Sequence, residues 1–275
     1  MGKSRAQIFR SRIMASAMVL ACAAALPGCG TAGKMTTGSI SRQSGKPLDR
    51  MSSAELSQAS AAFGRIYEKN PKDKQAGLNH ANALRMTGRN DQALAVMRQV
   101  AITHANDREV LAAYGKALAG AGEFDAALDA VRRAQRPDVP DWRLLSAEGA
   151  ILDQMGQQAN ARELYRKALD LQPNEPSILS NLGMSYLLAD DLKTAETYMR
   201  SAAQSSGADS RVRQNLALVV GLQGRFDEAE QIARQELSPE QAEANVAYLK
   251  SMLAQQNSWS KLKDKDAAAQ SASAQ

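Results

Sequence analysis

The stretch RVRQNLALVVGLQGRFDEAEQIAR, residues 211–234, contains the spacing that decides the fold. In it the small residue Ala217 is followed seven residues later by Gly224 and twelve residues later by Ala229. Apolar residues recur every three to four positions on both sides of the glycine, a pattern typical of two amphipathic helices separated by a turn. The stretch therefore predicts a helical hairpin whose helices approach each other closely at the two alanines.

The same spacing recurs every 34 residues without an insertion. We number the positions of each repeat as places 1 to 34, and the five repeats begin at Lys74, Arg108, Trp142, Pro176 and Ser210. Place 8 is always glycine or alanine, and place 15 is glycine except for Asp190 in repeat 4. Place 20 is alanine in all five repeats: Ala93, Ala127, Ala161, Ala195 and Ala229. We expect small residues at places 8 and 20 to allow close helix contact, and glycine at place 15 to end the first helix.

This pattern resembles the tetratricopeptide repeat, which has a 34-residue period, small residues at these places and proline after the second helix. Pro71 and Pro173 occupy place 32, where they end a second helix. The resemblance implies an all-α fold, a right-handed superhelix (solenoid) of five repeats over residues 74–243. It also implies helical caps, because the end repeats of such a stack would otherwise expose apolar faces.

Both flanks of the repeats have the pattern of capping helices. Residues 52–73 begin with Ser52-Ser-Ala-Glu55, which predicts a capping box, and then carry apolar residues at helical spacing. Residues 238–257 begin with Ser-Pro-Glu, a helix start signal, and place Ala242, Val246, Leu249 and Leu253 on one side. We expect these two segments to close the stack.

Residues 1–28 have the layout of a signal peptide. Four basic residues and no acidic one precede an almost wholly apolar run over 13–26, which is too short to span a bilayer comfortably. The run ends in Leu26-Pro27-Gly28-Cys29, which resembles the bacterial lipoprotein box. The resemblance implies that the Cys29 thiol receives diacylglycerol, that cleavage occurs between Gly28 and Cys29, and that an N-acyl chain such as palmitate is then added.

Two other interpretations of this N-terminus are open. The sequence Val19-Leu20-Ala21-Cys22 has the same residue types, but it would leave an apolar core of only eight residues. In the other, the segment is an ordinary secretory signal with incidental cysteines. With Cys29 lipidated, two or three acyl chains would hold the protein permanently on a membrane.

Residues 29–51 are rich in Gly, Ser and Thr, which predicts a flexible tether, and residues 258–275 predict a disordered tail. Gly30 follows the lipidated cysteine where lipoproteins retained in the inner membrane carry aspartate. The resemblance to lipoproteins therefore implies the outer membrane of a Gram-negative bacterium, with the chain facing the periplasm. The formal charge of +5 falls to +1 once the signal is removed, so it indicates no nucleic-acid partner.

The sequence contains no constellation of residues that indicates an enzyme. The only histidines, His80 at place 7 and His104 in an inter-repeat turn, are far apart, and neither has a cysteine nearby. No nucleophile elbow, phosphate loop or zinc-protease motif occurs. We therefore expect no catalytic residue, metal site, small-molecule substrate or cofactor, apart from the covalent lipid on Cys29.

A protein-binding groove is the best-supported site in the sequence. In the tetratricopeptide fold the first helices line a concave groove, which becomes apolar in repeats 4 and 5. The predicted partner groove consists of Asn181, Met184, Leu187, Leu188, Gln214, Asn215, Leu218 and Leu222. Such leucines could bury the side chains of a peptide while the amides pair with its backbone. In the alternative, the C-terminal helix folds over these residues and leaves no open site.

The segment 211–234 is also similar to the corresponding repeat of TadD-type lipoproteins of the tight-adherence (Tad/Flp) pilus assembly system. This resemblance implies a scaffold that mediates protein–protein interactions in the assembly of Flp (type IVb) pili and contacts the pilus secretin or another machine component. The alternative is a general periplasmic scaffold lipoprotein for outer-membrane protein assembly or for peptidoglycan enzymes.

Overall fold

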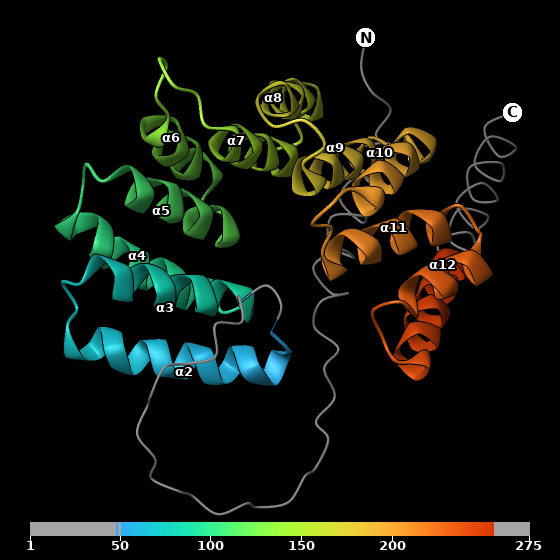
Figure 1. The fold of residues 1–275 in the computed structure, drawn as a ribbon, viewed down its shortest axis with the longest axis horizontal. Helices are drawn as coiled ribbons and strands as arrows, with labels where there is room; N and C mark the ends of the chain where they lie inside the picture. The colour runs from blue at the N-terminus through green and yellow to red at the C-terminus, as the bar shows by residue number, and fades with distance from the viewer. Residues whose placement is uncertain (1–47, 49–50, 256–275) are drawn as a thin grey trace, which may run out of the picture. The chain divides into compact units, whose positions relative to one another are not determined.

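The computed structural model describes Leu48 and residues 51–255, and every regular element in this part is helical (Figure 1). This confirms the predicted all-α fold. The signal peptide over 1–28, the tail over 258–275 and most of the predicted tether over 29–51 lie outside the described residues. The chain divides into two compact units with the boundary after Ala161. We refer to them as the N-terminal and the C-terminal unit.

The N-terminal unit is a stack of antiparallel helices. Its helices are α2 (Ser53–Lys69), α3 (Lys74–Met86), α4 (Asn90–Thr103), α5 (Arg108–Gly120), α6 (Phe124–Ala134) and α7 (Trp142–Gln154). Each of these helices contacts the next one along the chain, and α5 also contacts α3 and α7. The first helices of repeats 1 to 3 are therefore neighbours, and each second helix lies between two of them along the chain.

The C-terminal unit repeats this arrangement. The helix α8 (Gln158–Leu171) leads into it, and α9 (Pro176–Leu188), α10 (Leu192–Gln204), α11 (Ser210–Leu222) and α12 (Phe226–Ala233) follow. A closing helix over 239–255 ends the described part. Here too consecutive helices from α9 to α12 contact each other, and α9 contacts α11.

The first helices begin at residues 74, 108, 142, 176 and 210, the five starts of the sequence repeat. The residue before each start is acidic: Asp73, Asp107, Asp141, Glu175 and Asp209. Each of these side chains accepts a hydrogen bond from a backbone N–H in the first turn of the helix. The carboxylate thus satisfies a donor that has no partner within the helix and lies at the positive end of the helix dipole.

Place 15 ends the first helix as predicted. Gly88, Gly122, Gly156 and Gly224 have φ between 75° and 83°, in the left-handed region that glycine enters without steric cost. Asp190, which replaces glycine in repeat 4, has φ 65°. The turn geometry is therefore the same in all five repeats, and repeat 4 adopts it with a side chain present.

The small residues at place 8 lie against the second helix, as the sequence predicts. A Cβ atom added to Gly115 would lie 2.5 Å from Val131 Cγ2 and 3.2 Å from the carbonyl oxygen of Ala127. At Gly183 the corresponding distances are 2.8 Å to Met199 Cγ and 3.1 Å to the carbonyl oxygen of Ala195. The place-20 alanines are at most 1 % exposed, so both sides of this contact are fully packed.

Each segment expected to cap the repeats contains a helix, α2 over Ser53–Lys69 and the closing helix over 239–255. Ser52 and Glu55 form the predicted capping box at the start of α2. Gly64 and Tyr67 on α2 lie against the ring of His80 on α3, so His80 is at the interface of these two helices. In the closing helix Ala242, Val246 and Leu249 are buried.

A charged network joins repeats 4 and 5. The Glu196 carboxylate on α10 accepts hydrogen bonds from Arg200 Nε at 2.7 Å and from Gln223 Nε2 at 2.8 Å, and it pairs with Arg225. Glu228 on α12 pairs with Arg200 and Arg225. The hydrogen bond from Arg225, followed by those from Gln223 and Arg200, lowers the pKa of Glu196 from 4.5 to about 2 despite partial burial. Its charged form is therefore held strongly in the folded state.

The close contact at place 8 predicts that a glycine-to-alanine substitution lowers the free energy of unfolding by different amounts in repeats 2 and 4. Gly115→Ala should lower the free energy of unfolding by about 1–2 kcal/mol, because the new methyl group meets the stiff, β-branched Val131 and a backbone oxygen. Gly183→Ala should cost less, because the flexible Met199 side chain can shift, although the carbonyl oxygen of Ala195 also lies 3.1 Å from the added Cβ atom. Urea unfolding followed by circular dichroism measures both, and equal stability of the two variants would contradict the packing argument.

The network around Glu196 predicts an acid-sensitive contribution to stability. Because its pKa is lower in the folded than in the unfolded state, its contribution is complete above pH 4.5 and disappears as the pH falls towards 2. Glu196→Gln should lower the free energy of unfolding at pH 7 by about 1–3 kcal/mol and flatten its decline between pH 5 and 3. Glu163→Gln, at an exposed position on α8, is the matched control. The assignment fails if the two variants show the same pH profile.

Candidate functional site

The predicted groove residues lie on two neighbouring helices. Asn181, Met184, Leu187 and Leu188 are on α9, and Gln214, Asn215, Leu218 and Leu222 are on α11. These are the first helices of repeats 4 and 5, and they contact each other directly. The repeat register thus brings both halves of the predicted groove to one region of the C-terminal unit.

Most of the apolar groove residues keep part of their surface in solvent. Met184, Leu188, Leu218 and Leu222 are half-buried, and we call these four residues the apolar row. Such partial exposure leaves apolar area that a bound segment could cover.

The assignment of Leu187 to the groove was wrong. Its side chain is only 5 % exposed and belongs to the core. Leu187 occupies place 12, and the structure of the next repeat shows where this place points. A Cβ atom on Gly221, at place 12 of repeat 5, would lie 2.5 Å from Leu249 Cδ2 of the closing helix. Place 12 therefore faces the following helix rather than an open groove.

The closing helix packs against α11 and α12. Ala242 lies in a buried cluster with Ala217 and Ala233, and Leu249 lies against Gly221. Leu218 and Leu222 remain half-buried although this helix is in place. The closing helix thus resembles the first helix of a further repeat, and in the described part of the chain it leaves the apolar row partly accessible.

The predicted amides differ in how they are bonded. Asn215 Nδ2 donates to Ser180 Oγ at 3.1 Å, which links α11 to α9. Gln214 is exposed, and its Nε2 donates to Ser210 Oγ at 3.0 Å within its own helix. Asn215 therefore has a structural role between the helices, whereas the Gln214 amide is at the surface and available to a partner.

Sequence reasoning missed an arginine at place 25 of every repeat. These residues, the arginine column, are Arg98, Arg132, Arg166, Arg200 and Arg234. The first four each bind an acceptor on the following repeat. The pairs are Arg98 with Glu123, Arg132 with Glu148, Arg166 with the Tyr186 hydroxyl, and Arg200 with Glu228. Arg234, in the last repeat, pairs with Glu230 on its own helix. The five-fold recurrence of arginine at this place was the signal that could have revealed the column.

The described residues show no arrangement for metal chemistry. No group of three or more His, Cys, Asp or Glu side chains among Leu48 and residues 51–255 is placed to hold a metal ion. His104 Nε2 lies 3.1 Å from the Lys72 carbonyl oxygen in an inter-repeat turn. In the same residues, no helix combines the length and the apolar character that a membrane crossing requires. The predicted lipidation and cleavage site, Gly28 and Cys29, is outside the described part.

Comparison with known families finds repeats along the chain. Residues 48–107 and 78–141 match the family described as "Tetratricopeptide repeat", and residues 211–235 match another family of the same description. Residues 149–189 match a family described as "TPR repeat". No curated protein matches the chain.

Several solved structures share the fold. A tetratricopeptide repeat protein from Parabacteroides merdae ATCC 43184 has a TM-score of 0.61 at 11% identity, with 72% of this chain and 78% of that chain covered. TTC0263, a thermophilic TPR protein from Thermus thermophilus, has a TM-score of 0.53 at 21% identity, covering 61% and 91%. PilW, described as a widely conserved type IV pilus biogenesis factor, has a TM-score of 0.54 at 20% identity, covering 73% and 91%.

The matched segments, the hairpins that begin at the five repeat starts and the shared fold agree with one another. The chain belongs to the tetratricopeptide-repeat proteins, which are generally non-catalytic scaffolds for protein–protein interaction.

Proposed function

We propose that this chain is a lipid-anchored scaffold at the periplasmic face of a Gram-negative outer membrane, where it takes part in the assembly of Flp/Tad (type IVb) pili. The observation that carries the scaffold role is the apolar row, because its four side chains are only half-buried and lie on neighbouring first helices. The lipoprotein box ending at Cys29 supports the anchor. The similarity of residues 211–234 to TadD-type lipoproteins supports the pilus role, and the fold that the chain shares with PilW is compatible with it.

In the proposed mechanism the protein binds and positions a partner and makes or breaks no bond. An extended segment of the pilus secretin or of another assembly component would bury apolar side chains against Leu188 and Leu218. The Gln214 amide at the surface would pair with its backbone. The lipid on Cys29 confines this binding surface to the membrane, so a captured segment has a high effective concentration there. Affinity for each segment can then be modest.

The alternative is a general periplasmic scaffold for outer-membrane protein assembly or for peptidoglycan enzymes. The fold is shared with the Thermus and Parabacteroides proteins as well as with PilW, so it is compatible with either role. Both functions use the same anchor and the same apolar row. They differ in which process fails when the protein is removed.

The lipid anchor predicts that Cys29→Ser abolishes membrane attachment. Without the thiol no diacylglycerol can be added, so the variant should stay uncleaved or be mislocalised and should incorporate no labelled palmitate. Cys22→Ser is the matched control, because Cys22 would be removed with the signal peptide and should leave labelling unchanged. Palmitate labelling and detergent phase partitioning measure the outcome. If only the Cys22 variant loses labelling, Cys22 is the lipidated residue instead of Cys29.

The apolar row predicts a loss of pili without loss of the fold. In a strain lacking this gene, the wild-type chain should restore surface pili and crosslink to the secretin or another pilus component. The Leu188→Asp/Leu218→Asp variant should give at least tenfold fewer pili and no crosslink, because charges would face the apolar side chains of the partner. Its melting temperature should fall by only a few degrees, because both side chains reach solvent in the folded protein and are not fully buried.

Leu171→Asp is the matched control for the apolar row, because Leu171 is an exposed leucine on α8 outside it. This variant should restore pili fully. Normal piliation of the strain that lacks the gene would overturn the pilus role. Lowered levels of outer-membrane proteins in that strain would favour the general scaffold instead.

A further inference from the structure

One member of the arginine column has no carboxylate partner. The other four members each pair with a glutamate, whereas Arg166 Nη2 donates to the Tyr186 hydroxyl at 3.2 Å. The hydroxyl is neutral, so it satisfies a donor of the guanidinium group but leaves the positive charge uncompensated. In this respect Arg166 differs from the rest of the column.

A second arginine, Arg162, lies one helical turn before Arg166 on α8. Its guanidinium carbon lies 4.9 Å from the centre of the Tyr186 ring, and its Nη1 donates to the Ser185 carbonyl oxygen at 3.4 Å. Neither arginine forms an ion pair with any residue that the structure describes. Two guanidinium groups without a carboxylate partner thus meet at one tyrosine.

The tyrosine is itself held by a second aromatic ring. Tyr186 on α9 stacks on Tyr198 of α10, with ring centroids 5.5 Å apart and an interplanar angle of 8°. Arg166 is exposed, and the other three side chains are half-buried. The guanidinium groups are therefore positioned at the surface before any ligand binds, so binding would cost little further side-chain entropy.

The acidic group that interacts with this pair already has another role. Asp191 precedes α10, and its Oδ1 accepts a hydrogen bond from the Thr194 backbone N–H at 3.1 Å. The hydrogen bonds from Thr194 lower the pKa of Asp191, and the charge of Arg162 lowers it further without an ion pair between them. Within the described part of the chain, one capping carboxylate thus faces two arginines, and a net positive charge remains.

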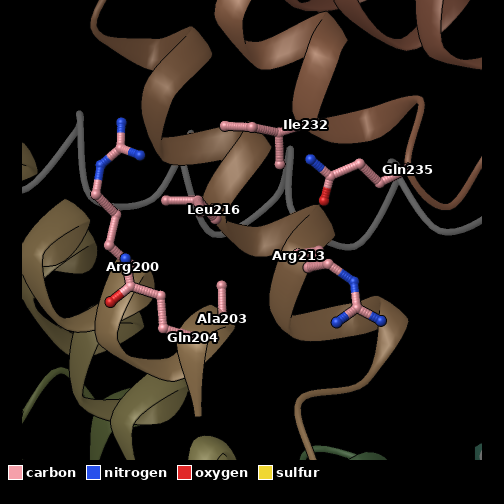
Figure 2. Close-up of a pocket in the computed structure, with 7 residues that line it drawn as sticks. All are labelled: Arg200, Ala203, Gln204, Arg213, Leu216, Ile232 and Gln235. Carbon is pink, nitrogen blue, oxygen red and sulfur yellow. The ribbon is translucent and has the colours of Figure 1, made fainter.

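The depression in Figure 2 is the opposite case. It has a volume of about 230 Å³, and Arg200 and Arg213 are among its lining residues. Arg200 pairs with two glutamates, and Arg213 pairs with Glu236. The charges of these arginines are already compensated, so the depression does not select an anionic ligand. The arginines around Tyr186 do select one, because an incoming carboxylate would displace no carboxylate of this chain.

The spacing of the two arginines indicates the geometry of the ligand. Arg162 and Arg166 are four residues apart on one helix, so their side chains leave the same face with Cβ atoms about 5–6 Å apart. Two acidic side chains four residues apart on another helix have the same spacing. Hydrogen bonds between guanidinium and carboxylate groups are charge-assisted and stronger than the present one to a hydroxyl.

We propose that Arg162 and Arg166 bind an acidic helical segment of a partner protein. Two carboxylates of the segment, four residues apart, would each pair with one guanidinium group. The site shares no residue with the apolar row, and it does not depend on the pilus role.

The test uses the full chain and two fluorescein-labelled helical peptides with blocked ends. One peptide carries pairs of glutamates four residues apart, and the other carries glutamine at the same positions. Fluorescence anisotropy should show binding of the glutamate peptide only, weakening as NaCl is added. Arg166→Gln should weaken this binding about fivefold, and Arg162→Gln/Arg166→Gln more than tenfold.

Arg234→Gln is the matched control. It removes the same charge at the same place of repeat 5, where the arginine already pairs with Glu230. This variant should bind the glutamate peptide as the wild type does. Arg166→Gln should melt like the wild type in circular dichroism, because Arg166 is exposed. The binding assay contains no pilus component, so its failure and a failure of the pilus role are separate results.

Three outcomes would overturn the proposal. In the first, the glutamine peptide binds as tightly as the glutamate peptide. In the second, Arg234→Gln weakens binding as much as Arg166→Gln, so that only the overall charge matters. In the third, sedimentation shows a dimer of the full chain that Arg166→Gln dissociates, so that a second copy of the chain occupies the site instead.

Discussion

The structure depends on the close approach of two helices at places 8 and 20 of each repeat. At Gly115 and Gly183 the carbonyl oxygen of the facing place-20 alanine would lie 3.1 to 3.2 Å from an added Cβ atom. The helices are therefore as close as the backbone allows. At this distance the larger side chains on either side interlock, and Val131 and Met199 become fully buried. A protein with few aromatic residues can in this way build a core from alanine, leucine, valine and methionine.

The sequence was sufficient to predict the hairpins, their starts and their turns, because each depends on one residue type at a fixed place. Gly224 ends a helix and Ala229 allows close packing in any context. The groove was predicted less well, because exposure depends on neighbours in the next repeat. Leu187 and Leu188 are adjacent leucines in the sequence, yet the first is buried and the second is half-exposed. Only the position of the following helix distinguishes them.

The arginine column shows a second limit of prediction from sequence. Its recurrence is visible in the sequence, but its acceptors are not at a constant place, since Arg98 pairs with Glu123, Arg132 with Glu148 and Arg166 with a tyrosine. A long guanidinium side chain can reach several positions on the next repeat. The arginine therefore recurs in every repeat of this chain while its partner varies. Such pairs at exposed sites add little to stability individually, whereas the more enclosed network around Glu196 contributes more.

The pairing of the arginines bears on where a partner could gain binding free energy. The first helices of repeats 4 and 5 present apolar side chains whose burial by a partner is favourable at any ionic strength. Most arginines of the second helices already have carboxylate acceptors, so a partner gains only the difference between its carboxylates and those in place. An exchange of acceptors at these arginines therefore gains little, whereas covering the apolar row removes apolar area from water.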